Sequence, residues 1–157
     1  MIFYELTTIL LVNKMKDKMY NDLIVVDIDS SIYDVGKKML EYDIGFILVN
    51  EKDKIVGVLT DRDIVTRIVA NKDDKISGYI TRDIKSVDIN DDINKALETM
   101  KKHKIKRLLV TDNDKVVGIV SLSNLLDSEN VMDTIKEIFA VNRNSDLYIT
   151  KVNEFYL

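Results

Sequence analysis

Residues 26–57 read VDIDSSIYDVGKKMLEYDIGFILVNEKDKIVG, and residues 87–118 read VDINDDINKALETMKKHKIKRLLVTDNDKVVG. The two stretches align without a gap at a constant offset of 61, and 12 of their 32 positions are identical. Self-similarity at one fixed period is typical of repeated supersecondary units. A copy of about 60 residues is marginal for burying a core alone. The fold is therefore expected to contain two copies of one unit that share a core.

Composition narrows the class of protein. The 157 residues are 46% apolar, which is ordinary for a globular chain, and the net charge is −4 with both signs interspersed. Such a charge does not indicate a nucleic-acid-binding surface. The absence of cysteine excludes disulfides and thiolate metal sites, and His103 is the one histidine. Residues 1–12 are mostly apolar but too short to cross a bilayer, and Glu5 argues against a signal peptide. We expect them to cover the core or a dimer seam.

Hydrophobic periodicity predicts the order β-α-β-β-α in both copies. In the first copy the expected elements are a strand at 23–26, a helix at 31–43, strands at 44–49 and 55–59, and a helix at 64–69. In the second copy they are a strand at 84–89, a helix at 93–100, strands at 105–110 and 116–120, and a helix that opens at 125–126. We expect the polar residues 71–75 to form the linker between the two copies. After the second copy, the pattern predicts a tail helix at 132–139, a break at 142–146 and a strand at 147–157.

Each copy ends its last strand with a hydroxyl followed three residues later by Asp or Asn. These pairs are Thr60 with Asp63 and Ser121 with Asn124. One interpretation is a capping box, in which the two side chains bond the free N–H groups of a helix start. The other is ribose capture, since a carboxylate can accept hydrogen bonds from two cis hydroxyls. The two roles can coexist.

A cationic pair, Lys106 and Arg107, stands at the start of the apolar strand 105–110. The first copy has Gly45 and Phe46 at the matching positions, so the pair occurs in one copy alone. Charges at a strand start are usually just solvated. Beside a nucleotide, a guanidinium would instead bind phosphate oxygens in a bidentate manner.

These motifs resemble a tandem pair of CBS (cystathionine beta-synthase) domains over about residues 15–127. The resemblance lies in the doubled repeat and in the stretches DIG (43–45), GVLTDRDI (57–64), KIKRLLV (104–110) and GIVSL (118–122). It implies an α+β fold in which two β-α-β-β-α repeats pack through their sheets with pseudo-twofold symmetry. The expected parts are an extension at 1–14, repeats at 15–70 and 76–127, and a helix and tail at 128–157.

The resemblance also implies two clefts between the repeats that bind adenosine-containing ligands. In the first cleft Thr60 and Asp63 would hold the ribose, and Lys106 and Arg107 would face the phosphates. The adenine would lie near Ile84, Lys85, Ile105 and Leu109. The second, degenerate cleft would use Ser121 and Asn124, with Ile24, Ile44 and Leu48 around the base.

Two departures from the family pattern bear on this site. Asn124 stands where an aspartate usually holds the ribose, and an uncharged amide should bind less well or not at all. Many family members carry proline where Leu48 and Leu109 stand, and this chain has no proline.

The sequence therefore predicts a cytoplasmic regulatory module that binds AMP, ADP or ATP and acts on an unidentified effector protein. The alternative is a scaffolding homodimer with empty clefts, or a binder of S-adenosylmethionine. No enzyme activity, metal, resident cofactor, nucleic acid or membrane partner is expected, because the chain lacks a Gly-rich phosphate loop and a nucleophile–base pair. A homodimer is expected because the predicted helices at 61–70 and 122–139 carry apolar residues on more than one face. Those residues are Ile64, Val65, Ile68, Val69, Leu125, Leu126, Met132, Ile135 and Phe139.

Overall fold

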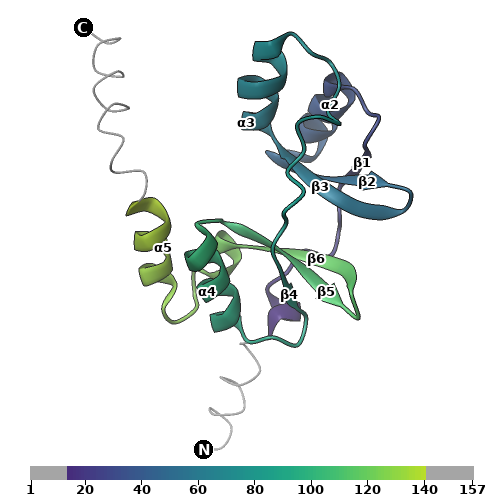
Figure 1. Cartoon of the computed structure of the whole chain (residues 1–157). Helices are drawn as coiled ribbons and strands as arrows, with labels where there is room; N and C mark the ends of the chain where they lie inside the picture. The colour runs from purple at the N-terminus through teal and green to yellow at the C-terminus, as the bar shows by residue number, and fades with distance from the viewer. Residues whose placement is uncertain (1–13, 141–157) are drawn as a thin grey trace, which may run out of the picture. The chain divides into compact units, whose positions relative to one another are not determined.

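The computed structural model describes residues 14–140, which form two compact units. We call residues 22–84 the first unit, and residues 14–21 together with 85–140 the second unit. Each unit contains one three-stranded sheet with helices, so the expected α+β class is confirmed (Figure 1). The elements predicted at residues 1–12 and 142–157 lie outside the described residues.

The first unit has the predicted β-α-β-β-α order. Its elements are β1 (Val25–Asp27), α2 (Ile32–Tyr42), β2 (Phe46–Glu51), β3 (Lys54–Thr60) and a helical stretch of α3 (Asp61–Asp63), η2 (Ile64–Ile68) and η3 (Val69–Asn71). Strand β1 pairs with β2 in parallel, and β2 pairs with β3 in antiparallel orientation. The Ser31 hydroxyl caps α2 by accepting from Asp34 N–H, as its position predicted. The helix ends at Asp43, whose φ of 50° is left-handed.

The second unit repeats this architecture through its last strand. Its elements are β4 (Ser86–Asp88), α4 (Ile93–His103), β5 (Arg107–Asp112), β6 (Lys115–Ser121), η4 (Leu122–Leu125) and α5 (Val131–Ala140), preceded by η1 (Met15–Asp17). Even the register irregularity is repeated, at Val49/Asn50 in one sheet and Val110/Thr111 in the other. The offset of 61 read from the sequence therefore holds in the strand pairing.

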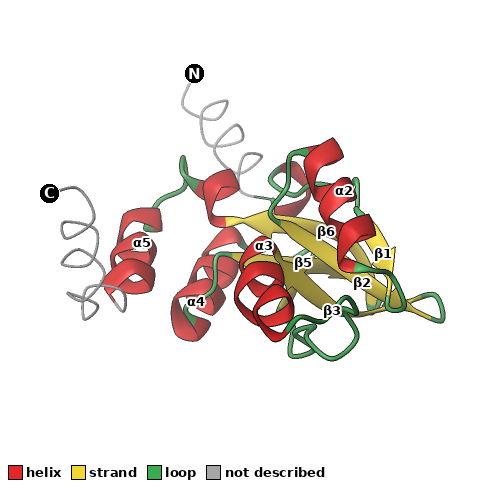
Figure 2. Cartoon of the chain, turned by 90° about the horizontal axis from the view of Figure 1, so that it is seen from above, coloured by secondary structure: helices red, strands yellow, loops and turns green. Residues whose placement is uncertain are grey.

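After β6 the second unit departs from the prediction. The helix expected to open at Leu125 and Leu126 is wrong, because η4 stops at Leu125. The tail helix expected at 132–139 is confirmed as α5, which begins at Val131. The intervening residues 127–130 are all polar, and Asn130 has a φ of 65°, which ends one helical path before the next begins. Helix α5 then packs against α4 (Figures 1 and 2). Its buried residues Val131 and Ile138 belong to the core of that unit.

The first residues of each repeat pair with the last strand of the other repeat, which the sequence reading missed. Tyr20 exchanges two backbone hydrogen bonds with Ile119 of β6, at 2.8 and 2.9 Å. Thr81, 61 positions later, exchanges two with Val58 of β3, both at 2.9 Å. Five residues upstream of each, Met15 is buried in the second unit's core and Ile76 in the first unit's core. Each sheet thus receives a backbone partner from outside the segment that sequence similarity defines.

Candidate functional site

Thr60 and Asp63 form a capping box where β3 meets α3. The Thr60 N–H and hydroxyl donate to Asp63 Oδ2 at 3.1 and 2.7 Å, and Asp63 N–H donates to Thr60 Oγ1 at 3.2 Å. Both side chains are half-buried. The arrangement satisfies N–H groups that a helix start leaves unpaired. The capping interpretation of the motif is therefore confirmed, and the carboxylate stands at a fixed position at the strand end.

Arg67 extends this pair into a network that the sequence reading missed. Its Nη1 donates to Asp63 Oδ1 at 3.1 Å and to the Tyr79 carbonyl at 3.0 Å, and its guanidinium lies 5.8 Å from the Tyr79 ring centroid. The Tyr79 hydroxyl in turn donates to Asp73 Oδ2 at 3.1 Å. The i, i+4 spacing of Asp63 and Arg67 on a helix was the signal available in the sequence.

This network keeps Asp63 ionised. Burial raises the pKa of the Asp63 carboxyl, but the hydrogen bonds from Thr60 and Arg67 outweigh burial and hold that pKa below its usual value. An ionised carboxylate offers about four lone-pair positions. Two donors from Thr60 and one from Arg67 occupy three of them. The carboxylate is therefore a charged acceptor with little unused capacity.

The corresponding pair in the second unit, Ser121 and Asn124, is uncharged. The Ser121 N–H and hydroxyl donate to Asn124 Oδ1 at 2.8 and 2.6 Å, and the Ser121 and Ser123 hydroxyls lie 2.7 Å apart. Ser128 stands where Arg67 stands in the first repeat, and its hydroxyl is buried without a hydrogen-bond partner among the described residues. The second repeat thus replaces both the carboxylate and the guanidinium with uncharged groups.

Lys106 and Arg107 lie in the second unit beside Ser121. Arg107 is the register partner of Ser121 across β5 and β6, and Lys106 O accepts from Leu122 N–H at 2.8 Å. Both cations line a pocket of about 270 Å³. Its other lining residues are Ser121, Leu122, Ser123, Leu126, Ile135 and Phe139. Thr60 and Asp63 belong to the first unit, and their cooperation with these cations stays a prediction.

The residues predicted around the adenine fall into two matching sets. Leu109 N–H donates to Lys85 O at 3.1 Å, and Leu48 N–H donates to Ile24 O at 3.1 Å. Leu48 and Leu109 are buried, whereas Ile24, Ile44, Ile84, Lys85 and Ile105 are half-buried. The parallel pairing therefore joins Lys85 to Leu109 in the second unit and Ile24 to Leu48 in the first unit, and the contact of the predicted residues with a base stays a prediction.

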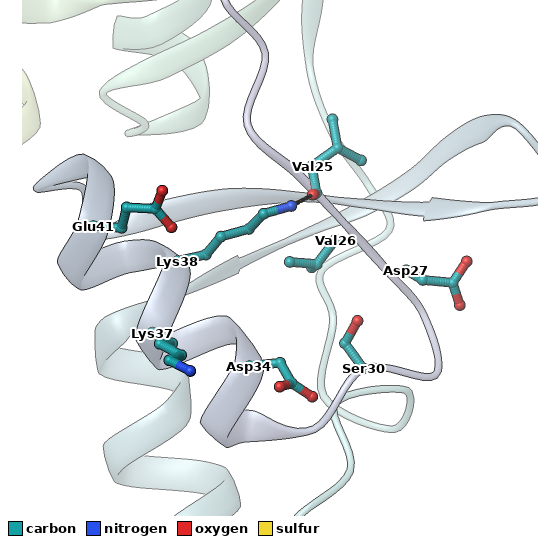
Figure 3. A pocket seen from close by; sticks show the side chains of 8 residues that line it. All are labelled: Val25, Val26, Asp27, Ser30, Asp34, Lys37, Lys38 and Glu41. Atoms are coloured by element: carbon teal, nitrogen blue, oxygen red, sulfur yellow. Dashed lines mark hydrogen bonds between the residues drawn. The ribbon is translucent and has the colours of Figure 1, made fainter.

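A second pocket, of about 240 Å³, lies between β1 and α2 of the first unit and was not predicted. Its lining residues are Val25, Val26, Asp27, Ser30, Asp34, Lys37, Lys38 and Glu41. Lys38 extends across it, and its Nζ donates to Val25 O at 2.6 Å (Figure 3). Three carboxylates and two ammonium groups nearly cancel there, so the pocket shows no preference for a ligand of either charge.

Comparison with known proteins agrees with this architecture. The model of the CBS domain matches residues 15–70 and 76–130, so the chain belongs to the CBS domain family, as a tandem pair. The resemblance read from the repeat is confirmed.

Three similar proteins illustrate the family. The uncharacterized protein YlbB of Bacillus subtilis is 36% identical over 121 residues, which cover 74% of this chain and 82% of that protein. A crystal structure of an uncharacterized conserved protein from Pyrococcus horikoshii has a TM-score of 0.67 at 29% identity, covering 75% of this chain and 92% of that one. The CBS domain pair of protein MJ0100 was solved in complex with 5′-methylthioadenosine and S-adenosyl-L-methionine. It has a TM-score of 0.65 at 24% identity, covering 71% of this chain and 91% of that one.

Two kinds of feature are absent from residues 14–140. No helix between residues 14 and 140 has the length and apolar character to span a membrane. The same residues contain no group of three or more His, Asp or Glu side chains placed to hold a metal ion.

Proposed function

We propose that this CBS pair is a regulatory module that binds AMP, ADP or ATP and thereby alters its contacts with an effector protein. The observation that carries the proposal is the ionised carboxylate of Asp63, fixed beside the Thr60 hydroxyl at the end of β3. A fixed anionic acceptor next to a hydroxyl fits the cis-diol of a ribose. Membership of the CBS family supports the class of ligand.

Ribose binding would require the Asp63 carboxylate to exchange one of its present hydrogen-bond donors for a ribose hydroxyl. A diol brings two donors to a carboxylate that already has three, so one of the existing donors must leave. Arg67 is the donor that can leave most easily, because its side chain is 46% exposed and can return to water. Release of Arg67 would also free the Tyr79 carbonyl, so ligand binding would be communicated to the segment that pairs with β3.

We predict that binding is asymmetric, with about one strong nucleotide site per chain. The reason is that Asp63 is a charged carboxylate whereas Asn124 offers one uncharged acceptor oxygen. Isothermal titration calorimetry with AMP, ADP, ATP and adenosine measures the number of sites directly.

The same titrations separate the alternative functions. Two sites of equal affinity would contradict the asymmetry. S-adenosylmethionine is titrated as a fifth compound, and no binding of any of the five would favour the scaffolding alternative. Tight binding of S-adenosylmethionine with no binding of the nucleotides would favour the S-adenosylmethionine alternative instead.

We also propose that the protein is a homodimer. Exposed apolar side chains remain on the helical stretch 61–71 and around α5, while Ile68 and Leu125 of the predicted set are fully buried. The exposed members are Val65 at 65%, Val69 at 52%, Leu126 at 59%, Met132 at 59% and Phe139 at 43%. A twofold interface is the commonest way to cover such surfaces. Light scattering after size exclusion should give twice the chain mass of 18.1 kDa. A monomer at micromolar concentration, with or without AMP, would refute the dimer.

A further inference from the structure

The residues that line the pocket beside α5 include two cationic side chains. Lys106 and Arg107 supply two positive charges, Ser121 and Ser123 supply hydroxyls, and no carboxylate is among the described residues that line it. The remaining walls are apolar: Leu122, Leu126, Ile135 and Phe139. Apolar walls lower the local dielectric and strengthen the attraction of the cations for an anion. The lining is therefore suited to a small phosphate-bearing group.

One of these cations is held by a residue from outside the repeat. Lys106 Nζ lies 4.2 Å from the centroid of the Phe139 ring, a cation–π contact. The ring is 43% exposed, so it is not a core residue and its contact with Lys106 is its clearest interaction. An ammonium group over a ring retains N–H donors that can point elsewhere.

Helix α5 is anchored independently of this contact. Val131, Thr134 and Ile138 are buried at 4%, 3% and 4% exposure. Lys104 Nζ also donates to Glu137 Oε2 at 2.8 Å and to Glu137 O at 3.0 Å. The helix therefore presents Phe139 to Lys106 from a fixed base. The first unit has Gly45 and Phe46 at the positions of Lys106 and Arg107, so it has no counterpart of the contact between Lys106 and Phe139.

We infer that Phe139 is a positioning residue for anion binding: it holds the Lys106 ammonium at the pocket, where that ammonium binds a phosphate or diphosphate group. The inference rests on the proposed function for its class of ligand, because AMP, ADP and ATP all carry such a phosphate group. A lysine held in place loses less rotamer entropy when it binds an anion, so the ring raises affinity without touching the ligand. Helix α5, which follows the second repeat, would thus control phosphate affinity.

The test is a double-mutant cycle on the full-length protein, with inorganic pyrophosphate as the probe and adenosine as a separate ligand. Lys106→Ala should weaken pyrophosphate binding by about tenfold or more, because it removes a charge-assisted bond. Phe139→Leu should weaken it by about threefold, the scale of an exposed cation–π contact. In the Lys106→Ala background, Phe139→Leu should cause no further loss, since the ring acts through the lysine.

Two control variants distinguish a positioning role of Phe139 from a purely structural role of this residue. Phe139→Tyr keeps the ring face and should bind pyrophosphate as the wild type does. Met132→Leu alters an exposed residue of α5 that does not line the pocket, and it should also have no effect. The inference would be overturned if the losses of pyrophosphate affinity caused by the two substitutions were additive. It would also be overturned if Phe139→Leu bound pyrophosphate as the wild type does, or if the wild type did not bind pyrophosphate. Failure to bind adenosine, with the cycle intact, would instead overturn the proposed nucleotide function and leave the anion site standing.

Discussion

Asp63→Ala is expected to weaken the binding of AMP, ATP and adenosine alike by roughly 100-fold. The variant removes the carboxylate that we propose accepts hydrogen bonds from the ribose, and each charge-assisted bond is worth about 1.5–3 kcal/mol. Because the ribose is common to all three ligands, their losses should be similar. Isothermal titration calorimetry on the folded variant measures them.

The variant will also affect stability, and this effect must be separated from binding. The Asp63 carboxylate accepts hydrogen bonds from the Thr60 N–H and from Arg67. Removing the carboxylate should therefore lower the free energy of unfolding by about 0.5–2 kcal/mol, because the helix cap is lost. Circular dichroism should show an intact fold. Asn124→Ala is the matched control, since it breaks the equivalent cap in the second repeat and should leave the strong site unchanged. Unchanged ligand affinity in folded Asp63→Ala would mean that ribose recognition does not involve this carboxylate.

The second large effect is expected from Gly118→Ala, which should destabilise the protein by about 1–3 kcal/mol. An added Cβ at Gly118 would lie 2.8 Å from the Tyr20 carbonyl oxygen and 2.8 Å from Met19 Sδ. The oxygen belongs to the backbone segment that pairs with Ile119, so it cannot move without weakening those hydrogen bonds. Urea unfolding followed by circular dichroism measures the loss.

Two other glycines provide matched controls. At Gly57 the closest atoms are Ile80 Cδ1 at 3.0 Å and the Thr81 carbonyl oxygen at 3.1 Å, so Gly57→Ala should cost less than Gly118→Ala. At Gly36, inside α2, an added Cβ meets nothing within 4 Å. Gly36→Ala should therefore stabilise the protein by about 0.5–1 kcal/mol through helix propensity. Equal effects of all three substitutions would show that the packed segments are not the cause.

Comparison of the two repeats identifies Gly57 and Gly118 as equivalent positions, but it does not explain why both are glycine. Gly57 and Gly118 are identical positions in the alignment, which marks them as constrained. Neither has a positive φ, so the constraint is not a turn. The reason is the close approach of residues 80–81 and 19–20, whose pairing with β3 and β6 was not predicted. Extending the alignment upstream of residue 26 would have placed Met15 opposite Ile76, both of which are core residues.

Local pattern was sufficient for most secondary-structure elements. The apolar residues of α2 and α4 recur at helical spacing within a few residues of one another, and the structure contains both helices. The helix after Ser121 was predicted wrongly for a related reason. The apolar residues Leu125 and Leu126 favour a helix, but the polar residues 127–130 that follow, with Asn130 in a left-handed conformation, prevent it from continuing.

The resemblance of the repeated motifs to CBS domains indicated the family and the α+β fold. Local periodicity and the repeat indicated the strand–helix junctions that carry Thr60, Asp63, Ser121 and Asn124. These properties depend on neighbours close in sequence and on self-comparison. Three features needed the folded chain: the segments that pair with β3 and β6, the bonds from Arg67 to Asp63 and Tyr79, and the contact of Lys106 with Phe139. Most of these partners are far apart in sequence, 33 residues for Lys106 and Phe139 and 99 for Tyr20 and Ile119. Only tertiary packing brings such partners together, because the closure of long loops leaves no periodic signal in the chain.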